Sequence, residues 1–339
     1  MKSRHRSAPR VGVLGATGLV GETLVRWLLA RDEFEIAWLG ASPEREGTSA
    51  TEFFHVAEGR LPPFAPALPV PDEAELLTFV FSALPAAVAA TIEPLWAEKT
   101  IVVSNASTHR LDPLVPLVVP EINADHMAPL LGRQREERGW RGLVTNPNCI
   151  VVPLVMALAP WRDLGLEAAC VTTYQALSGA GRHGPSAFEA TGNVIPEIPG
   201  ESAKVESEPL RILGRPERPL EGFTISSATA RVPVPNGHLL HVRVKLREPA
   251  VRGGLLARWE QMTGLTTTPA CPAPLEVMAR PPRPSDLERF DLVVRVGGLR
   301  PDPVLGWQFW TLADNLARGA AGAAWLNALA IQQRLGRAR

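Results

Sequence analysis

Short apolar segments alternate with stretches of helical spacing through the first part of the chain. After the first segment, apolar residues recur at Leu24, Val25, Leu28 and Leu29, which is the spacing of one helix face. Strands that alternate with helices favour βαβ units and a parallel sheet. We therefore predict an α/β fold with a Rossmann-like, doubly wound parallel sheet. Its strands are expected at residues 11–14, 34–39, 77–81, 101–103 and 143–145.

The pattern changes after residue 149, where the apolar strands lengthen and fewer helices separate them. Such a pattern is typical of an α+β domain with a mostly antiparallel sheet. The last apolar run, residues 317–335, is an Ala-rich helix that we expect to return to the first domain. A length of 339 residues suits two domains. We predict a nucleotide-binding domain of residues 1–148 plus the C-terminal helix 316–339, and a catalytic and dimerisation domain of residues 149–315.

Charge and cysteine content exclude several classes of protein. Lys and Arg together number 35, as do Asp and Glu, so neither nucleic acid nor an anionic membrane is an expected partner. The longest uncharged run, residues 76–92, is interrupted by Ser82 and Pro85 and indicates strand, turn and helix instead of a membrane span. The three cysteines are too few and too scattered for a disulfide framework or a metal site. We expect no metal and a reducing, cytoplasmic location.

A glycine-rich turn follows the first predicted strand and precedes the first predicted helix, with the sequence Gly15-Ala16-Thr17-Gly18-Leu19-Val20-Gly21. Glycines at such a turn let a phosphate approach the free N–H groups at the helix start. The spacing is G-x-x-G-x-x-G and differs from the more usual G-x-G-x-x-G. Its place in a βαβ unit favours a dinucleotide site, and the alternative is a turn that is merely tight.

Residues just after the second predicted strand bear on the choice of nucleotide. An acidic residue usually binds the ribose hydroxyls of NAD at this point. Here Ser42 stands near it, with Glu44 and Arg45 just beyond. Serine and arginine can bind a 2′-phosphate, so NADP is favoured. NAD is the alternative, which Glu44 supports.

The segment Asn146-Pro147-Asn148-Cys149 joins a β-leaning segment to a helical one. Free N–H groups and the positive end of a helix dipole favour an anion at such a turn. A Cys placed there becomes a thiolate and a nucleophile. The alternative is a buried Cys that acts as a small hydrophobic residue.

The segment Arg231-Val-Pro-Val-Pro-Asn-Gly-His238 is a strand that ends in a Gly turn. A His at this place can be the acid/base partner of a thiolate, and the alternative is a loop His bonded to the backbone. Arg231 lies on an otherwise apolar strand and needs an anionic partner, either structural or a substrate carboxylate.

Three more segments carry polar candidates. Gln175 ends a predicted strand, where its amide can orient a carbonyl, and the loop with Ser178-Gly179 follows. Glu201 and Lys204 have the spacing of a helical i,i+3 pair, which on a surface is worth little. Arg110 follows the polar run 104–107 at a strand end, the edge where open α/β sheets bind ligands.

The order and spacing of these segments over nearly the whole chain resemble aspartate-semialdehyde dehydrogenase, and its archaeal and fungal branch more closely than the common bacterial one. The matching segments are VGVLGATGLVG, FSALP, SNASTHR, VPLVVPEIN, TNPNC, YQALSGAG, IPGESAK, ISSATARVPVPNGH, RPPRP and ADNLARGAAG.

The resemblance implies that Cys149 is the nucleophile, that His238 is the acid/base catalyst and that Gln175 holds the substrate in place. Arg231 matches the clamp for the substrate α-carboxylate, and Glu201 matches the partner of its α-amino group. The residues that match the phosphate site, or lie beside it, are Lys204, Arg110, Asn105 and Asn148. The residues that match the NADP site are Gly15, Thr17, Gly18, Leu19, Val20, Ser42, Arg45, Ser82, Ser178, Gly179 and Asn315.

The implied reaction is NADP-dependent reductive dephosphorylation of L-aspartyl 4-phosphate through a thioacyl enzyme. A free thiol is only a few per cent thiolate at neutral pH, so activation of Cys149 by His238 and the helix terminus is expected to matter. The family also implies a homodimer or homotetramer. Glu44-Arg45 replaces the usual Arg-Ser pair and Thr48 replaces a common Lys, so the cofactor preference stays open.

Three rival functions remain. A malonyl-CoA reductase on the same scaffold uses the same Cys and His but needs no α-amino partner, so Glu201, Lys204 and Arg231 favour an amino-acid substrate. The motifs fit N-acetyl-glutamyl-phosphate reductase less well. A catalytically inactive dinucleotide-sensing protein has no need of an intact Cys149 and His238.

Overall fold

The structure, a computed structural model, describes residues 8–265 and 271–337. Its contacts divide the chain into two compact units. The first unit contains the residues up to Val115 together with Leu131–Thr145, and the second contains Pro116–Leu130 and the residues from Asn146 onward. No helix in the described part of the chain is both long enough and apolar enough to cross a membrane.

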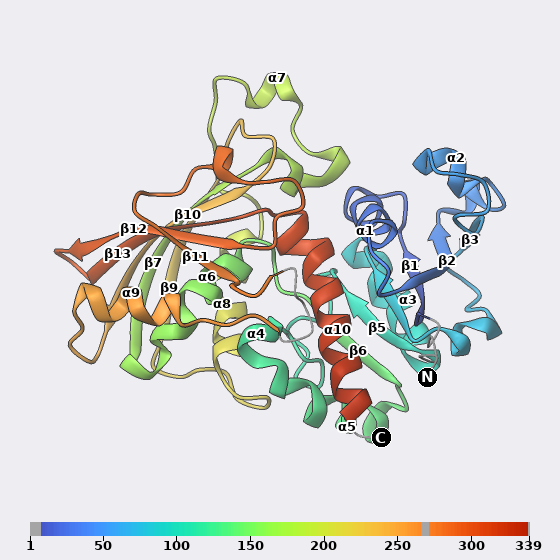
Figure 1. Ribbon diagram of the computed structural model, residues 1–339, viewed down its shortest axis with the longest axis horizontal. Coiled ribbons are helices and arrows are strands. Elements are labelled where there is room, and N and C mark those ends of the chain that lie inside the picture. The colour runs from blue at the N-terminus through green and yellow to red at the C-terminus, as the bar shows by residue number, and fades with distance from the viewer. Residues whose placement is uncertain (1–7, 266–270, 338–339) are drawn as a thin grey trace, which may run out of the picture. The chain divides into compact units, whose positions relative to one another are not determined.

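The first unit is built on a six-stranded sheet with the strand order β3-β2-β1-β4-β5-β6, in which every pairing is parallel. The predicted doubly wound parallel sheet is confirmed (Figure 1). Its strands are β1 (Arg10–Leu14), β2 (Glu35–Ala41), β3 (Phe64–Pro66), β4 (Phe79–Ser82), β5 (Ile101–Ser104) and β6 (Gly142–Thr145). The helices between them include α1 (Leu19–Leu29), α2 (Ala50–Phe54), α3 (Ala86–Lys99) and α5 (Met127–Arg138).

Strands β4, β5 and β6 of this sheet are mostly apolar because both of their faces are covered. Every residue of β4, β5 and β6 is buried, as expected for a parallel sheet between helical layers. Parallel strands end at the same edge, so the turn after β1, the loop after β2 and the loop after β5 share one edge of the sheet. That edge is where sheets of this kind bind nucleotides.

The second unit contains a seven-stranded mixed sheet with the order β11-β12-β13-β10-β7-β9-β8. Four pairings are antiparallel and two, β7–β9 and β11–β12, are parallel. The predicted mostly antiparallel sheet is confirmed. The strands are β7 (Leu166–Gln175), β8 (Ile195–Pro196), β9 (Thr224–Arg231), β10 (His238–Leu246), β11 (Leu275–Met278), β12 (Val294–Asp302) and β13 (Gly306–Ala313). The helices include α4 (Pro120–Asn123), α6 (Val151–Leu158), α7 (Ala187–Ala190), α8 (Glu201–Leu213), α9 (Arg252–Glu260) and α10 (Gly322–Arg337).

Alternating side chains give this second sheet one buried and one half-exposed face. Val171, Val242 and Phe309 belong to the buried core, in which the rings of Trp161 and Trp259 stack at 4.6 Å. On the opposite face Tyr174, His241 and Trp310 are half-exposed, and the Trp310 ring contacts the other two. A strand period of two produces this alternation.

The C-terminal helix begins with a π-helical segment, Ala317–Ala321, before α10. In this segment Gly319 and Ala321 donate their N–H groups five residues back. The contacts group α10 with the second unit, and its predicted membership of the nucleotide-binding domain stays a prediction. Residues 1–7, 266–270 and 338–339 of the predicted domains lie outside the described residues.

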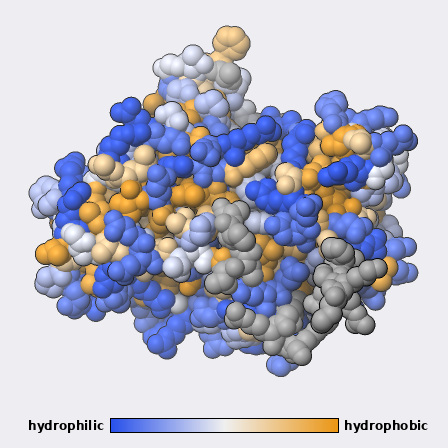
Figure 2. Space-filling model, in the orientation of Figure 1, coloured by the Kyte–Doolittle hydropathy of each residue, from blue (hydrophilic) through white to orange (hydrophobic). Residues whose placement is uncertain are grey.

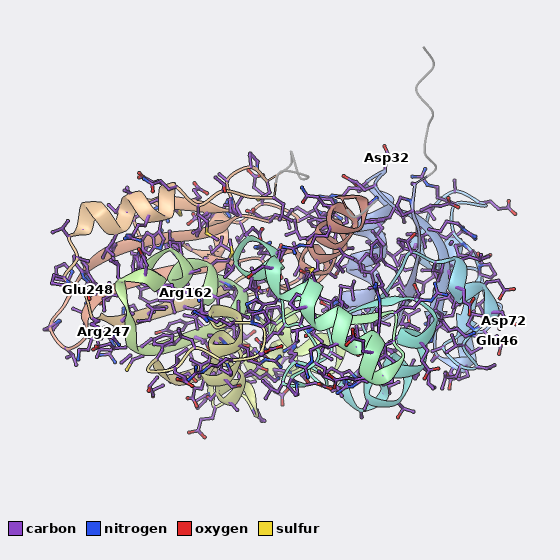
Figure 3. All side chains as sticks on the ribbon, turned by 90° about the horizontal axis from the view of Figure 1, so that it is seen from below. Asp32, Glu46, Asp72, Arg162, Arg247 and Glu248 are labelled. Carbon is purple, nitrogen blue, oxygen red and sulfur yellow. The ribbon has the colours of Figure 1, made fainter. Side chains whose placement is uncertain are left out.

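Charged side chains are concentrated at the surface. The residues labelled in Figure 3 are all exposed, with Arg247 and Glu248 after β10 and Asp32 after α1. Hydrophilic residues cover most of the face shown in Figure 2, with apolar residues gathered in smaller patches. The buried charged groups of the second unit therefore need a specific explanation.

Candidate active site

The turn that carries Cys149 connects β6 to α6, as predicted. Asn148 caps the start of the helix: its backbone carbonyl accepts the N–H of Val151 at 2.9 Å, and its side-chain oxygen Oδ1 accepts the N–H of Ile150 at 3.0 Å. The Cys149 thiol is half-exposed and lies 3.8 Å from the same Oδ1. The helix start therefore supports negative charge at an accessible sulfur.

The side-chain amide of Asn148 is held by a carboxylate from α8. Its Nδ2 donates to both carboxylate oxygens of Glu201, at 3.1 and 3.0 Å. The same carboxylate accepts the Lys204 ammonium at 2.6 Å and the amide of Gln175 at 3.5 Å. Glu201 is only 9% exposed. The predicted i,i+3 pair between Glu201 and Lys204 is present, but it is not a surface pair, because α8 directs Glu201 inward.

Arg231 ends β9 and His238 begins β10, and both bond to the backbone of Ala176. The Ala176 carbonyl accepts Nη1 of Arg231 at 2.8 Å, and the Ala176 N–H donates to Nδ1 of His238 at 3.1 Å. A Cβ built on Gly179 would lie 2.8 Å from both Arg231 Nη1 and His238 Nε2. The two side chains therefore meet at one point, and a glycine at 179 leaves room for them.

Burial and the Arg231 charge together hold His238 neutral. The ring is fully buried, and burial, followed by the neighbouring guanidinium, lowers the pKa of His238 to about 3. Because Nδ1 accepts a hydrogen bond, the neutral ring carries its proton on Nε2, which has no protein partner among the described residues. His238 thus presents Nε2–H as a hydrogen-bond donor to a ligand bound in the site.

Arg231 is a buried cation that forms no ion pair with a carboxylate in residues 8–265 and 271–337. Burial lowers the pKa of Arg231, and the charges of Cys149 and Glu201 oppose this shift. The interaction works in both directions, so the guanidinium also stabilises the Cys149 thiolate. A buried arginine without a carboxylate partner is a binding site for an anion.

Ser178 and Asn315 support the loop before His238. Asn315 Nδ2 donates to Ser178 Oγ at 2.9 Å, and Ser178 Oγ donates to Asn236 Oδ1 at 2.9 Å. Asn315 Oδ1 accepts the N–H of Gly237 at 2.9 Å. The predicted cofactor contacts of Ser178, Gly179 and Asn315 stay predictions, and the structure gives Ser178 and Asn315 an additional role in fixing this loop.

The glycine turn of the first unit fits a dinucleotide. Gly15 has a φ of 71°, and a Cβ there would lie 2.8 Å from the Ala83 carbonyl oxygen. A Cβ on Gly21 would lie 2.1 Å from the Gly15 carbonyl oxygen. Gly18 caps α1 without a side-chain bond, so the first N–H groups of the helix are available to a pyrophosphate. Thr17, Leu19 and Val20 are half-exposed around this turn.

The loop after β2 carries Ser42 and Arg45, both exposed. The Ser42 hydroxyl bonds to the carboxylate of Glu44 and lowers its pKa. The Arg45 guanidinium lies 4.9 Å from the centre of the Phe53 ring. The acidic and basic candidates for contacting the ribose therefore occupy the same short loop.

The loop after β5 joins three predicted residues of the first unit. Asn105 bonds through its N–H and its side-chain amide to the Ser82 carbonyl, at 2.9 and 3.3 Å. Arg110 is buried and donates Nη2 to the Asn105 carbonyl at 2.7 Å. Behind them Glu93 accepts the Ser104 hydroxyl at 2.6 Å, and burial raises the pKa of Glu93. Backbone carbonyls at the ends of β4 and β5 thus hold Asn105 and Arg110 close to each other.

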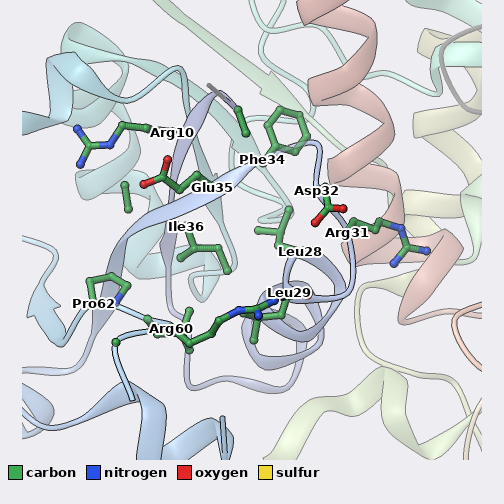
Figure 4. A pocket seen from close by; sticks show the side chains of 14 residues that line it. Arg10, Leu28, Leu29, Arg31, Asp32, Phe34, Glu35, Ile36, Arg60 and Pro62 are labelled. Carbon is green, nitrogen blue, oxygen red and sulfur yellow. Dashed lines mark hydrogen bonds between the residues drawn. The ribbon is translucent and has the colours of Figure 1, made fainter. Parts of the chain in front are cut away.

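A separate pocket of about 630 Å³ lies at the opposite end of β1 and β2 (Figure 4). It is lined by Arg10, Arg31, Arg60, Asp32 and Glu35 among others. The guanidinium groups of Arg10 and Arg31 point in opposite directions in Figure 4. They do not converge on one anion, and the mixed charges give this pocket no defined ligand.

Three contributors to the site were missed in the sequence. Ala176 acts through its backbone, which no sequence pattern reveals. Gly319 packs on Cys149, since a Cβ there would lie 2.6 Å from Cys149 Cβ. Glu208 accepts the Asn148 N–H at 2.6 Å, and its spacing of seven residues from Glu201 was the signal available in the sequence.

No group of side chains suited to a metal ion occurs in the described part of the chain. This finding does not test the expectation that the protein holds no metal.

Comparison with known proteins gives one consistent family. Residues 10–129 match the family described as "Semialdehyde dehydrogenase, NAD binding domain", and residues 158–318 match "Semialdehyde dehydrogenase, dimerisation domain". The aspartate-semialdehyde dehydrogenase of Archaeoglobus fulgidus is 39% identical over 94% of this chain and 96% of its own. The malonyl-CoA reductase (NADP) of Metallosphaera sedula is 29% identical over 95% and 96%. The crystal structure of Candida albicans aspartate-semialdehyde dehydrogenase with NADP is similar with a TM-score of 0.84, at 28% identity over 96% and 99%.

Gly319→Ala is expected to displace Cys149, because the added carbon would lie 2.6 Å from Cys149 Cβ and 3.0 Å from its Cα. We expect alkylation of Cys149 by iodoacetamide, followed by mass spectrometry, to slow by about tenfold or more. Gly253→Ala in α9 is the control, since nothing lies within 4 Å of its Cβ position. Equal rates in the two variants would show that Gly319 has no such role.

Replacing Arg231 with Met is expected to raise the pKa of His238 from about 3, because it removes the neighbouring positive charge. Burial is the larger cause, so the pKa should stay below the ordinary value of 6.5. An NMR titration of the His238 ring measures the shift. Arg243→Met is the matched control, because Arg243 lowers the pKa of His241 instead. An unchanged His238 pKa in Arg231→Met would contradict the prediction.

Proposed function

Because the chain belongs to the aspartate-semialdehyde dehydrogenase family, we propose that it reduces L-aspartyl 4-phosphate to L-aspartate 4-semialdehyde with NADPH and releases phosphate. This reaction serves the biosynthesis of lysine (through diaminopimelate), threonine, methionine and isoleucine. The single observation that carries the proposal is the pair of opposite charges near the nucleophile. Arg231 offers a buried cation without a carboxylate partner in the described residues, and Glu201 offers a buried carboxylate.

This pair of charges suits the α-carboxylate and α-ammonium groups of an amino acid. The Glu201 carboxylate is now shared by the Lys204 ammonium and two amide groups, so it accepts cationic and N–H donors readily. Arg231 can form a two-pronged bond with a carboxylate. With both ends of aspartate held, its side-chain acyl phosphate is directed at Cys149.

In the first step the Cys149 thiolate attacks the acyl carbon, the carbon–oxygen bond to phosphate breaks, and inorganic phosphate leaves. The thiolate is stabilised by Arg231 and by the start of α6. Gln175 orients the acyl group. For the departing phosphate we propose Lys204, Arg110 and Asn105, with Asn148 beside it, as the resemblance implies.

In the second step the thioester on Cys149 is reduced. NADPH, when bound, supplies the hydride that adds to the thioester carbon. The resulting hemithioacetal carries an oxyanion, and breakage of its carbon–sulfur bond yields the aldehyde and returns the Cys149 thiolate. The residues proposed to hold the nucleotide are those of the Gly15–Val20 turn, Ser42, Arg45, Ser82, Ser178, Gly179 and Asn315.

His238 serves this sequence first as a hydrogen-bond donor. Its neutral ring already carries a proton on Nε2, so it suits stabilising the oxyanion of each tetrahedral stage. Uptake of a further proton by the ring becomes easier once the substrate carboxylate offsets the Arg231 charge, because the pKa of His238 then rises. The role of acid/base catalyst is thus tied to substrate binding.

We propose NADP as the cofactor, with NAD as the alternative. Ser42 and Arg45 are exposed at the end of β2, where a 2′-phosphate would be bound. Glu44 bonds to Ser42 and adds negative charge to the same loop. Saturation curves with NADP and NAD in one assay decide between them.

The reverse reaction tests the function. The purified protein is given aspartate semialdehyde, phosphate and NADP or NAD, and the absorbance of the reduced nicotinamide is followed. A parallel assay with malonate semialdehyde, CoA and NADP tests the rival function that the Metallosphaera relative represents. Activity only in the second assay would overturn the substrate assignment, and activity in neither would favour a catalytically inactive dinucleotide-sensing protein.

Cys149→Ala is expected to abolish turnover, because no other described residue replaces the thiolate. His238→Asn should lower kcat by about 10²- to 10⁴-fold with nucleotide affinity retained, as for loss of an acid/base catalyst. Steady-state rates and nucleotide titrations measure both. An active Cys149→Ala protein would contradict the mechanism.

We also propose that the chain forms a cytoplasmic homodimer, with a homotetramer as the alternative. The second unit matches a dimerisation domain, and on the half-exposed face of its sheet the Trp310 ring contacts the rings of Tyr174 and His241. Aromatic side chains of this kind are enriched in protein interfaces. None of Cys149, Cys170 and Cys271 forms a disulfide within the described residues, which suits a reducing compartment.

Trp310→Glu should weaken this dimer by about 2 kcal/mol or more, which is a roughly 30-fold rise in Kd. The cause is a charge placed among the contacting rings of Tyr174 and His241. Light scattering over a dilution series measures the mass. Phe188→Glu is the control, because Phe188 is 96% exposed on α7 and outside this face. A variant Trp310→Glu that remains a dimer would place the interface elsewhere.

A further inference from the structure

Helix α8 directs a second carboxylate, Glu208, at the turn of the nucleophile. Glu201 and Glu208 are seven residues apart, which is about two helical turns, so both lie on one face of α8. Val205 lies between them on this face and is fully buried. Glu201 bonds to the side chain of Asn148, and Glu208 accepts its backbone N–H. One helix face thus holds the residue before Cys149 at two points.

We propose that Glu208 is a positioning residue, which fixes the backbone of Asn148 and thereby the Cys149 thiol at the start of α6. The proposal rests on the proposed role of Cys149 as the nucleophile. Glu208 does not touch substrate in this mechanism.

The hydrogen bond between Asn148 and Glu208 is short and buried. The distance from the Asn148 nitrogen to Glu208 Oε2 is 2.6 Å, and the Glu208 side chain is buried, with 2% exposure. Hydrogen bonds of an amide to a carboxylate are stronger than neutral ones. A buried N–H that loses its acceptor retains its full desolvation cost, so Asn148 would rotate to recover a partner.

Rotation of Asn148 would disturb the nucleophile directly. The Oδ1 of Asn148 accepts the Ile150 N–H at 3.0 Å and lies 3.8 Å from the Cys149 sulfur. The Asn148 carbonyl accepts the first N–H of α6, that of Val151. A shift at Asn148 therefore loosens the helix start that stabilises the thiolate.

Two variants of Glu208 separate position from charge. Glu208→Gln keeps the length and an oxygen acceptor and loses the charge. Glu208→Asp keeps the charge and withdraws the acceptor by one methylene. A positioning role predicts that Glu208→Gln retains activity and that Glu208→Asp loses it. A purely electrostatic role predicts the reverse. Glu208→Met keeps the size without an acceptor and replaces Asp in the comparison if Asp does not fold.

Steady-state kinetics in the semialdehyde, phosphate and NADP assay is the first readout. Glu208→Asp and Glu208→Met should lower kcat by about 10²-fold with little change in KM, as expected for a nucleophile misplaced by about 1 Å. Glu208→Gln should stay within about threefold of the wild type. Wild-type kcat in both Asp and Met, or a Gln variant as slow as they are, would overturn the proposal.

The pH profile of Cys149 alkylation by iodoacetamide is the second readout and needs no substrate. Its midpoint should move upward by about one pH unit in Glu208→Asp, because a disordered helix start stabilises the thiolate less, and should not rise in Glu208→Gln. If the wild type lacks reductase activity, the proposed function fails while this profile still decides the role of Glu208. An unmoved midpoint in both Asp and Met counts against it.

Glu206 of the same helix provides matched controls. Its carboxylate accepts the N–H of Ser227 on β9 at 3.0 Å, which is the same kind of bond at a distance from Cys149. Glu206→Asp and Glu206→Gln should change thermal stability about as much as the Glu208 variants and leave kcat and the alkylation midpoint unchanged. An equal loss of kcat in Glu206→Asp would mean that any damage to α8 suffices, and the specific proposal would fall.

Discussion

The need to satisfy every polar group of the buried residue Asn148 is the constraint on which this site depends. Its N–H, its side-chain amide, its side-chain oxygen and its carbonyl each have a partner. An unpaired buried polar group costs about 1–3 kcal/mol, so an alternative arrangement of the turn would lose several such bonds. The turn therefore has one well-defined conformation, and the thiol that follows it is held half-exposed at the start of α6.

Burial acts on the two basic groups opposite this turn with different results. It lowers the pKa of both Arg231 and His238, yet an arginine stays protonated in a protein while a histidine becomes neutral. The site consequently combines a permanent cation with a neutral N–H donor. The cation stabilises a thiolate and can bind a carboxylate, and the donor is suited to an oxyanion. The Arg231 and His238 side chains both bond to the backbone of Ala176, and this shared partner fixes their positions relative to each other.

Much of the fold follows from local patterns, and most of the remainder depends on contacts between distant segments. Strands β4, β5 and β6 of the first unit were predictable because they are short apolar runs between helical stretches, and the turn at Gly15 was predictable because only glycine fits there. The three-residue strand β3 was not predicted. The parallel pairing of β7 with β9 was not predictable from the sequence, because strand order is set by packing across the sheet. The two-residue strand β8 is too short to leave a pattern.

The site shows the same division. Cys149 and His238 were candidates because of the turns on which they lie, and only the resemblance to the family favoured their catalytic roles over a buried Cys and a loop His. Glu201 and Lys204 have the spacing of an ordinary surface pair, and only the orientation of α8 shows that Glu201 is buried. The π-helical start of the last helix was also beyond prediction, because its sequence is that of a regular Ala-rich helix.

That irregular segment packs against Cys149 within the second unit. A π-helical turn is rare and is found mostly at functional sites. Here it places Gly319 against Cys149, and its neighbour Arg318 forms a fully buried ion pair with Glu121 of α4 at 2.9 Å. A buried ion pair adds little net stability, but removal of one partner costs about 3–5 kcal/mol, so the pair strongly restricts the register of the segment. Cys149 is therefore held through Asn148 by α8 and limited by Gly319 on the π-helical side, which leaves the thiol little freedom to move.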